Sequence, residues 1–390
     1  MQSRSRRLFI LLLLATLAFL YTQIQSASGR DAALMPTSVP LSGNSTILLV
    51  SAFFPLSKSK HTMADYENWL CRFLRPITTD IYFYTPPEMA DLVRRCRGPL
   101  PIHIDTRFTR PFDVPPLRGM EAEYAAMQAL DREKRIHSAE LYAAWNAKPY
   151  LLDEAVKMLA ETQQRRYAYA FWNDAGSFRG VHEYTDWPDE GKVREVWREG
   201  GRLTGIKEEE LLFFPVCRVP HSSYQYWVED TGPVDGYFGE ASFFGGPPEA
   251  ISWWRTVFYA YHDAYLARGL FVGKDQNLIF ALFLLFPERI LAVWQDDPDA
   301  PAAAKHEYED LLGTCGANWF YYQFWLASDA TQDAMRRIWL AEARSWLSWG
   351  WWRERSACRV TRVVAVRELL ARQLGRGWRP PASNLLSVGM

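Results

Sequence analysis

The segment 171–176, Phe-Trp-Asn-Asp-Ala-Gly, places a carboxylate directly after a run of β-forming aromatic residues. In an open parallel sheet, ligands bind at the carboxyl ends of the strands. Asp174 and the side-chain carbonyl of Asn173 offer the hard oxygen ligands that Mn²⁺ or Mg²⁺ prefers, and such an ion would neutralise the diphosphate of a nucleotide-sugar. The same residues also suit a tight turn with no ligand. We therefore treat Asn173 and Asp174 as donor-binding candidates, with Asp174 as the metal ligand.

Two other carboxylates are catalytic candidates. Asp275 follows Gly273-Lys274 at the predicted start of a helix, where it would act as a general base toward an acceptor hydroxyl or simply as a helix cap. Glu240 begins an aromatic segment that ends in Gly245-Gly246. Paired glycines allow a ligand to approach the backbone, and they equally allow a plain strand-to-helix turn. We expect Glu240, Gly245 and Gly246 to contact a sugar.

Lys148 is a candidate for contact with the donor phosphates. It lies in the segment 145–149, Trp-Asn-Ala-Lys-Pro, inside a long helical pattern. An ammonium there would counter the charge of a leaving diphosphate. Most helical lysines are solvated surface residues, so this role depends on Lys148 meeting the carboxylates in space.

The elements that must position these residues alternate between strand and helix. Strand patterns at 46–53, 80–84 and 101–105 alternate with helical patterns at 62–74 and 86–95. This order is typical of βαβ units and a largely parallel sheet. Helical patterns follow at 120–135 and at 138–162, the second interrupted by Pro149.

The second half of the chain continues the alternation. The clearest inner strand is at 167–172, and further strands are predicted at 211–215 and 289–293. The segment 238–246 has the pattern of an apolar turn bounded by glycine. The remaining predicted elements are helices, at 191–200, 248–268, 274–286 and 329–349.

The N-terminal segment carries a targeting pattern. Arginines precede an apolar run at 8–24, which predicts a short cytoplasmic tail (1–7) and a signal-anchor helix with the rest of the chain translocated. Small residues at 26–28 leave cleavage, and hence secretion, as the alternative. The polar segment 25–45 predicts a flexible stem, and Asn44-Ser45-Thr46 is a glycosylation sequon if this side is lumenal. We expect a single-pass type II membrane protein facing the Golgi or ER lumen.

The amino-acid composition further limits the functions that the protein could have. The formal net charge is −1, which gives no basis for nucleic-acid binding. The 17 Trp, 19 Tyr and 22 Phe supply faces on which sugar rings stack, although most aromatics fill cores. Five cysteines would form one or two disulfides in an oxidising lumen, with a pairing that their spacing does not decide. The predicted domains are a catalytic domain at 46–357 and a poorly ordered C-terminal tail at 358–390.

Several of these segments resemble one family. The chain resembles the bacterial HtrL/YibB-type family of glycosyltransferase-like proteins and anchored fungal relatives. The segments that carry the resemblance are residues 51–61 with Tyr66 and Trp69, the helix at 140–152, the motif 172–176, and the segments 240–246 and 273–276. The resemblance covers about residues 46–326 and implies a GT-A-like fold, with a Rossmann-type sheet flanked by helices. It implies that Asp174 stands at the last position of an Asp-x-Asp-type motif, whose first carboxylate this chain lacks.

These observations predict a glycosyltransferase of the hexosyltransferase type. Its partners would be a nucleotide-sugar donor and a glycan, glycolipid or glycoprotein acceptor. Two alternatives remain open at the level of sequence. A glycoside hydrolase would use Asp174 and Asp275 as its pair of carboxylates. A carbohydrate-binding protein without catalysis would be consistent with the missing first carboxylate.

Overall fold

The computed structural model describes residues 40–42, 45–303, 311–344 and 355–387. These residues belong to one compact unit, residues 38–390. The predicted tail (1–7), signal-anchor (8–24) and Asn44 lie outside the described residues, as does nearly all of the stem. Within the described ranges, no helix combines the length and the apolar character needed to cross a membrane.

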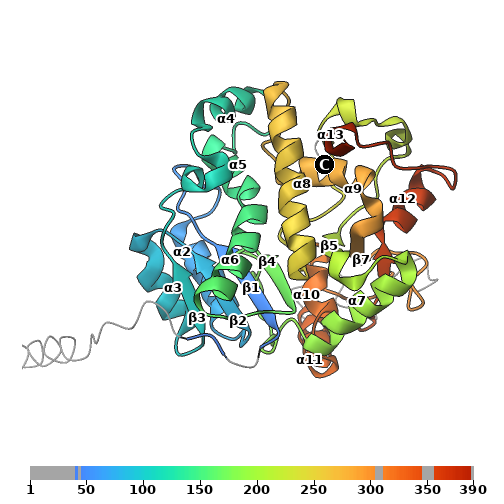
Figure 1. Cartoon of the computed structure of the whole chain (residues 1–390). Helices are drawn as coiled ribbons and strands as arrows, with labels where there is room; N and C mark the ends of the chain where they lie inside the picture. Colours follow the sequence, from blue (N-terminus) through green and yellow to red (C-terminus); the bar gives the residue numbers. More distant parts are fainter. Residues whose placement is uncertain (1–39, 43–44, 304–310, 345–354, 388–390) are drawn as a thin grey trace, which may run out of the picture. The chain divides into compact units, whose positions relative to one another are not determined.

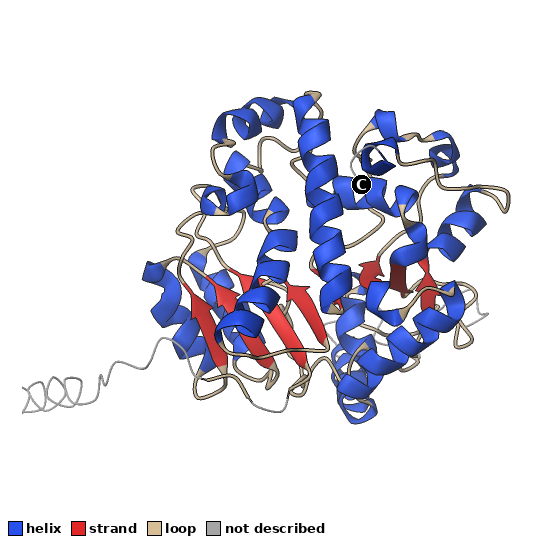
Figure 2. Cartoon of the chain, in the orientation of Figure 1, coloured by secondary structure: helices blue, strands red, loops and turns tan. Residues whose placement is uncertain are grey.

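An eight-stranded sheet forms the centre of the unit (Figure 2), in the order β3-β2-β1-β4-β6-β5-β7-β8. All neighbouring pairs are parallel except those made by β6 and β8, which run antiparallel to their neighbours. The predicted α/β class with a mostly parallel sheet is confirmed. The strands are β1 (Ile47–Ala52), β2 (Asp80–Tyr84), β3 (Ile102–Asp105), β4 (Tyr169–Asn173), β5 (Leu212–Val216), β6 (Phe243–Gly246), β7 (Ile290–Trp294) and β8 (Val363–Ala365).

Helices cover both faces of the sheet (Figure 1). One buried core contains side chains of α5, α6, α8, α9 and α12, and the other contains side chains of α2, α3, α7, α10 and α11. The described helices are α2 (Met63–Leu74), α3 (Ala90–Arg97), α4 (Glu121–Met127), α5 (Ala139–Asn146), α6 (Lys148–Thr162), α7 (Glu190–Thr204), α8 (Pro248–Ala267), α9 (Asp275–Leu285), α10 (Tyr321–Trp325), α11 (Asp329–Arg344), α12 (Val366–Leu374) and α13 (Asn384–Ser387).

The strand β1 shows why the sheet carries two cores. Its residues alternate between the two faces, so Leu48 and Val50 enter the first core while Ile47 and Leu49 enter the second. All of them are buried. A strand that is apolar on both faces is expected in a parallel sheet covered by helices on both sides.

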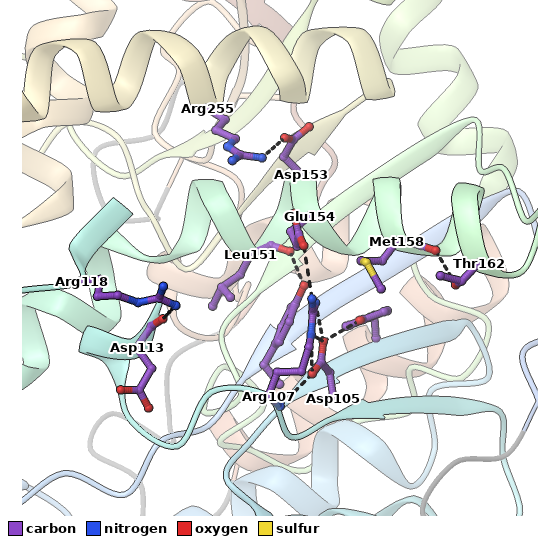
Figure 3. Close-up of polar contacts among 12 residues, drawn as sticks. Asp105, Arg107, Asp113, Arg118, Leu151, Asp153, Glu154, Met158, Thr162 and Arg255 are labelled. Carbon is purple, nitrogen blue, oxygen red and sulfur yellow. Dashed lines mark hydrogen bonds and ion pairs between the residues drawn. The ribbon is translucent and has the colours of Figure 1, made fainter. Parts of the chain in front are cut away.

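Helix α6 is fixed to the sheet and to α8 by polar contacts (Figure 3). Arg107, just after β3, forms an ion pair with Asp105 at 2.8 Å and reaches Glu154 of α6 at 3.4 Å. From the other side, Arg255 of α8 contacts Asp153 of α6 at 2.7 Å. These contacts fix the position of α6, whose first residue is Lys148.

The break before α6 was predicted from Pro149. The helical pattern at 138–162 divides into α5 and α6 at Ala147, and Pro149 occupies the first turn of α6. Proline is tolerated there because the first amides of a helix have no intrahelical partner. The break leaves Lys148 at the start of a helix instead of in the middle of one.

Three sequence predictions need correction. The segment 238–246 contains the strand β6 and not only a turn. The pattern at 120–135 gives a helix only for Glu121–Met127 and a short 3-10 turn after it. The tail predicted to be poorly ordered from residue 358 contains β8 and α12, because Val363–Ala365 pairs with β7 and the apolar face of α12 is buried in the core.

Two disulfides cross-link the second core. Cys71 of α2 pairs with Cys96 of α3, and Cys315 pairs with Cys358. Cys217 is free and buried. The expected number of one or two disulfides is therefore confirmed, and the structure supplies the pairing.

Candidate functional site

The site lies at the edge of the sheet where β1, β4, β5 and β7 end. Since β6 is antiparallel to β4, Phe243 at its start pairs with Asn173 at the end of β4. The chain entering β6 therefore reaches the same edge as the chain leaving β4. Two backbone bonds fix it there: the Asp174 amide donates to the Ser242 carbonyl at 2.8 Å, and the Glu240 amide donates to the Pro215 carbonyl at 2.9 Å.

Lys148 is the centre of the site. Its ammonium lies 3.2 Å from Asp174 Oδ1 and 3.0 Å from Asp275 Oδ2 and donates to the Ala241 carbonyl at 3.0 Å. The residue is only 5 % exposed. Burial lowers the pKa of Lys148, but the two carboxylates raise it more strongly, so the net shift is upward and the ammonium stays charged.

Asp174 is the most accessible carboxylate of the group. Its side chain is 34 % exposed, whereas that of Asp275 is 7 % exposed. Trp172 Nε1 donates to Asp174 Oδ1 at 2.6 Å. The ammonium also donates to Oδ2 at 3.4 Å, so both oxygens have a partner, and the carboxylate keeps an exposed part that solvent or a ligand can reach.

Asp275 has one oxygen bonded to a backbone amide and one that faces the Lys148 ammonium. At the start of α9, Oδ1 accepts from the Gln276 amide at 2.8 Å. Oδ2 is buried and lies against the Lys148 ammonium, yet no described residue gives it a hydrogen bond of good geometry. Burial raises the pKa of Asp275 although Lys148 opposes that rise. Oδ2 is therefore ready to accept a proton or a hydrogen bond from a ligand.

Glu240 lies behind these groups and is almost fully buried, at 1 % exposed. Burial raises its pKa well above the ordinary value, the Asp174 charge adds to the rise, and a hydrogen bond from Ser242 and the Lys148 charge oppose it. The pKa of the Tyr322 phenol is also raised, by burial and then by the nearby Glu240 charge.

The structure thus brings Lys148, Asp174, Asp275 and Glu240 together, from α6, the end of β4, the start of α9 and the segment before β6. The sequence predicted the four as candidates. Their individual roles in binding or catalysis stay predictions.

The other predicted donor-binding residues lie elsewhere. Asn173 is fully buried, and its side-chain oxygen accepts from Ser177 at 3.1 Å. Gly245 and Gly246 lie inside β6, where a Cβ on Gly245 would be 2.1 Å from the Ala170 carbonyl oxygen. Close strand packing accounts for the glycines there.

Several residues of the site were not predicted from the sequence. Trp172, Ser242 and Tyr322 contact or surround the carboxylates. Trp172 was visible in the motif but was assigned only to the strand. Tyr322 lies far along the chain in the short helix α10, and no spacing pattern links it to Asp174.

A separate group of possible metal ligands occurs in the described part of the chain, made of Asp131, Glu133 and His137. The Lys274 ammonium contacts Glu133 and lies 3.8 Å from Asp131 Oδ1. The Tyr142 hydroxyl donates to Asp131 Oδ2 at 2.7 Å. Lys274 already supplies positive charge to this group, so its geometry is explained without an ion.

The donor set at Asp174 fits one type of metal binding only. Asp174 offers a partly exposed carboxylate, while the oxygen of Asn173 is occupied by Ser177. A divalent ion there would take most of its ligands from phosphate and water, as Mg²⁺ commonly does.

Comparison with known proteins finds distant likenesses among solved structures. No family model and no curated protein matches the chain. Among solved structures, the apo form of mouse xyloside xylosyltransferase 1 is similar with a TM-score of 0.36 and 11 % identity, over 64 % of this chain and 85 % of that chain. A likeness this distant carries no argument about fold or activity. The resemblance to the HtrL/YibB-type family stays a prediction from the sequence motifs.

Proposed function

We propose that this protein transfers a glycosyl group, such as a hexose, from a nucleotide-sugar to a sugar-containing acceptor. The observation that carries the proposal is the buried Lys148 ammonium, held between Asp174 and Asp275 at the ligand-binding edge of the sheet. The group brings acceptors for sugar hydroxyls and an ammonium together in one place, and a metal ion bound with the donor would add the positive charge that its phosphates need.

In this proposal each side chain has a distinct role. Lys148 counters the negative charge on the departing nucleoside diphosphate. Asp275 Oδ2 accepts the proton of the acceptor hydroxyl as the hydroxyl oxygen bonds to the anomeric carbon and the bond from that carbon to the phosphate oxygen breaks. The raised pKa of Asp275 makes it a stronger base than an ordinary aspartate. Asp174 orients the donor, and the buried Glu240 carboxyl forms hydrogen bonds behind it.

A divalent metal ion would bind at Asp174. When bound with the donor, Mn²⁺ or Mg²⁺ would neutralise part of the diphosphate charge, and Asp174 would hold it together with phosphate oxygens. One carboxylate next to an ammonium binds an ion weakly. We expect Mn²⁺ binding in calorimetry to be weak for the protein alone and stronger by about tenfold or more with a nucleoside diphosphate present.

The hydrolase alternative is less well supported by the same contacts. A glycoside hydrolase needs two carboxylates with a glycosidic bond between them. Here one ammonium contacts both Asp174 and Asp275, so Lys148 fills the space where that bond would lie. Sugar binding without turnover remains the second candidate, because the buried carboxyl groups of Glu240 and Asp275 would serve binding equally well.

The cellular location is part of the proposal. We propose that the catalytic unit faces the lumen of the secretory pathway, with the segment at 8–24 as its membrane anchor. Two disulfides support this, since they persist in oxidising compartments and are rare in the cytosol.

The test is release of nucleoside diphosphate from a panel of nucleotide-sugars by the purified full-length protein, with Mn²⁺, with Mg²⁺ and with neither. Asp275→Asn should lower turnover by about a hundredfold or more, because it removes the base. Asp329→Asn makes the same change on an exposed side chain of α11 and should leave turnover unchanged. Absence of turnover with every donor would reject the transferase, and glycoside binding alone would then favour the carbohydrate-binding protein.

A further inference from the structure

A cavity lies at the start of α9. It is a cavity of about 170 Å³, bounded by the loop after α4, the loop around residues 231–235 and the chain entering α9. A water occupies about 30 Å³ in the liquid, so the space suits one small ring and not an oligosaccharide. The lining residues used below are Arg132, Asp235, Lys274, Asn277, Leu270 and Phe271.

The charged groups around this cavity are already paired. Arg132 forms an ion pair with Asp235. Lys274 forms an ion pair with Glu133 and lies close to Asp131. A charged ligand would have to displace one of these partners, whereas an uncharged ligand would not. The cavity therefore favours an uncharged ligand.

Asn277 supplies the unfilled hydrogen-bonding group. The residue is 5 % exposed and lines the cavity. Its backbone is engaged, with its amide donating to Lys274 and its carbonyl accepting from Val234. In the described part of the chain no hydrogen bond reaches its side chain, although a buried amide ordinarily has partners. An amide both donates and accepts, which matches a pair of ring hydroxyls.

The apolar wall completes the chemistry of a sugar site. Leu270 and Phe271 line the cavity and are half-buried. Phe271 packs edge-on against Tyr142 with ring centroids 5.4 Å apart, which fixes its position. A pyranose presents hydroxyls at its edge and C–H groups on its faces, so it needs polar and apolar walls of this kind.

The cavity adjoins the candidate site. Lys274 lines the cavity, while the next residue, Asp275, meets Lys148. We propose that this cavity is an acceptor subsite, which holds one uncharged monosaccharide unit next to the group that activates the acceptor hydroxyl. The acceptor role rests on the proposed transferase function, whereas the binding of an uncharged pyranoside does not.

The experiment measures binding directly. Saturation-transfer NMR on the full-length protein would use methyl glucoside, galactoside, mannoside and xyloside, each in both anomeric forms. Asn277→Leu removes the amide and fills the cavity, and should weaken binding by about tenfold or more. Gln163→Leu makes a similar change at the end of α6, at the opposite edge of the sheet, and should leave binding unchanged. If Asn277→Leu does not fold, Thr231→Trp blocks the cavity from its exposed rim.

The outcomes separate the two proposals. Loss of a glycoside signal in Asn277→Leu or Thr231→Trp, with retention in Gln163→Leu, supports the subsite. Absence of any glycoside signal, or equal signals in all variants, overturns it. Release of nucleoside diphosphate by transfer to water needs no acceptor sugar, so it reports on the transferase alone in the wild type, and Gln163→Leu should leave it unchanged. If the protein binds a glycoside at the cavity but turns over no donor, the acceptor role is rejected and the cavity remains a sugar-binding site.

Discussion

Lys148 is a cation in the first turn of a helix, where the helix macrodipole disfavours positive charge. It is buried there because Asp174 and Asp275 compensate it. We predict that Lys148→Met lowers the free energy of unfolding by about 3–5 kcal/mol, since Asp275 is left buried without its counter-ion. Urea denaturation measures the change.

Lys157→Met is the matched control, on the same helix. Lys157 pairs with Asp153, but its side chain is 46 % exposed and Arg255 also contacts that carboxylate. Its loss should cost less than about 1 kcal/mol. In the double variant Lys148→Met/Asp275→Asn, part of the lost stability should return. Equal destabilisation by both lysine substitutions would contradict the role given to Lys148 in the buried group.

Glu240 gives stability a pH dependence. Its pKa is raised in the folded state by burial, so the folded protein keeps a proton that the unfolded chain releases as pH rises above the ordinary range of a glutamate. This contribution is fully present below that range and is lost as pH rises toward the raised pKa. We predict that Glu240→Gln becomes more stable relative to the wild type with increasing pH, by up to about 1.4 kcal/mol per pH unit.

The measurement is urea denaturation of both proteins at about pH 5.5, about pH 6.5 and about pH 7.5. Glu123→Gln, on the exposed side of α4, should show no such trend relative to the wild type. A stability difference that stays constant with pH in Glu240→Gln would show that Glu240 is ionised in the folded protein.

The candidate residues could be predicted from the sequence because each lies next to a recognisable end of a strand or start of a helix. Asp174 follows a strand, Asp275 opens a helix, and Lys148 precedes a proline. The sequence did not predict that they meet in one site, since this depends on how α6 and α9 pack at one edge of the sheet. Asn173 shows the opposite case: adjacent to Asp174 in sequence, it points into the interior and bonds to Ser177.

At the scale of elements, β6 is the strand that the sequence pattern did not predict. It has only four residues, and two of them are glycines, which weaken any strand pattern. The glycines are required because β6 lies against β4 at very close range. A Cβ on Gly245 would be 2.1 Å from the Ala170 carbonyl oxygen and 2.7 Å from the Phe171 Cα, and neither backbone atom can rotate away.

We predict that Gly245→Ala destabilises the protein by about 3 kcal/mol, because β4 or β6 must shift. The same shift would move Asp174, so donor turnover should fall as well. Thermal denaturation measures the first effect. Gly180→Ala is the control, since its Cβ would meet nothing within 4 Å and the residue is exposed. A melting temperature for Gly245→Ala equal to that of Gly180→Ala would mean that β6 is not packed as described.

The longer elements were predicted well, for a physical reason. Strands β1, β2, β5 and β7 are apolar on both faces, and α2 begins at a capping box formed by Thr62 and Asp65. The three-residue strand β8 was missed because its pairing with β7 is a tertiary contact, which local pattern does not encode.

At the scale of the whole molecule, the cysteines make a chemical prediction. Of the five in the chain, Cys217 is free and the other four are paired. Protein made in an oxidising secretory system, unfolded without reductant and treated with iodoacetamide, should gain one adduct by intact mass. Reduction should raise this to five adducts. It should also lower the stability by about 2–4 kcal/mol for each bridge, because the unfolded chain regains freedom.

Cys217→Ala is the control and should take up no reagent before reduction. Three adducts in unreduced wild type would mean that one bridge does not form in solution.

The strand β8 has a consequence for how the protein is made. Residues 363–365 complete the sheet by covering the outer side of β7, and the chain has 390 residues. A ribosome must therefore synthesise the chain from β7 through residue 365 before β7 gains this neighbour. Until then β7 presents an unpaired edge, the kind of surface through which nascent chains associate wrongly. A stop codon shortly before Val363 would leave that edge permanently bare, so such a truncated product should aggregate even though the whole candidate site precedes it.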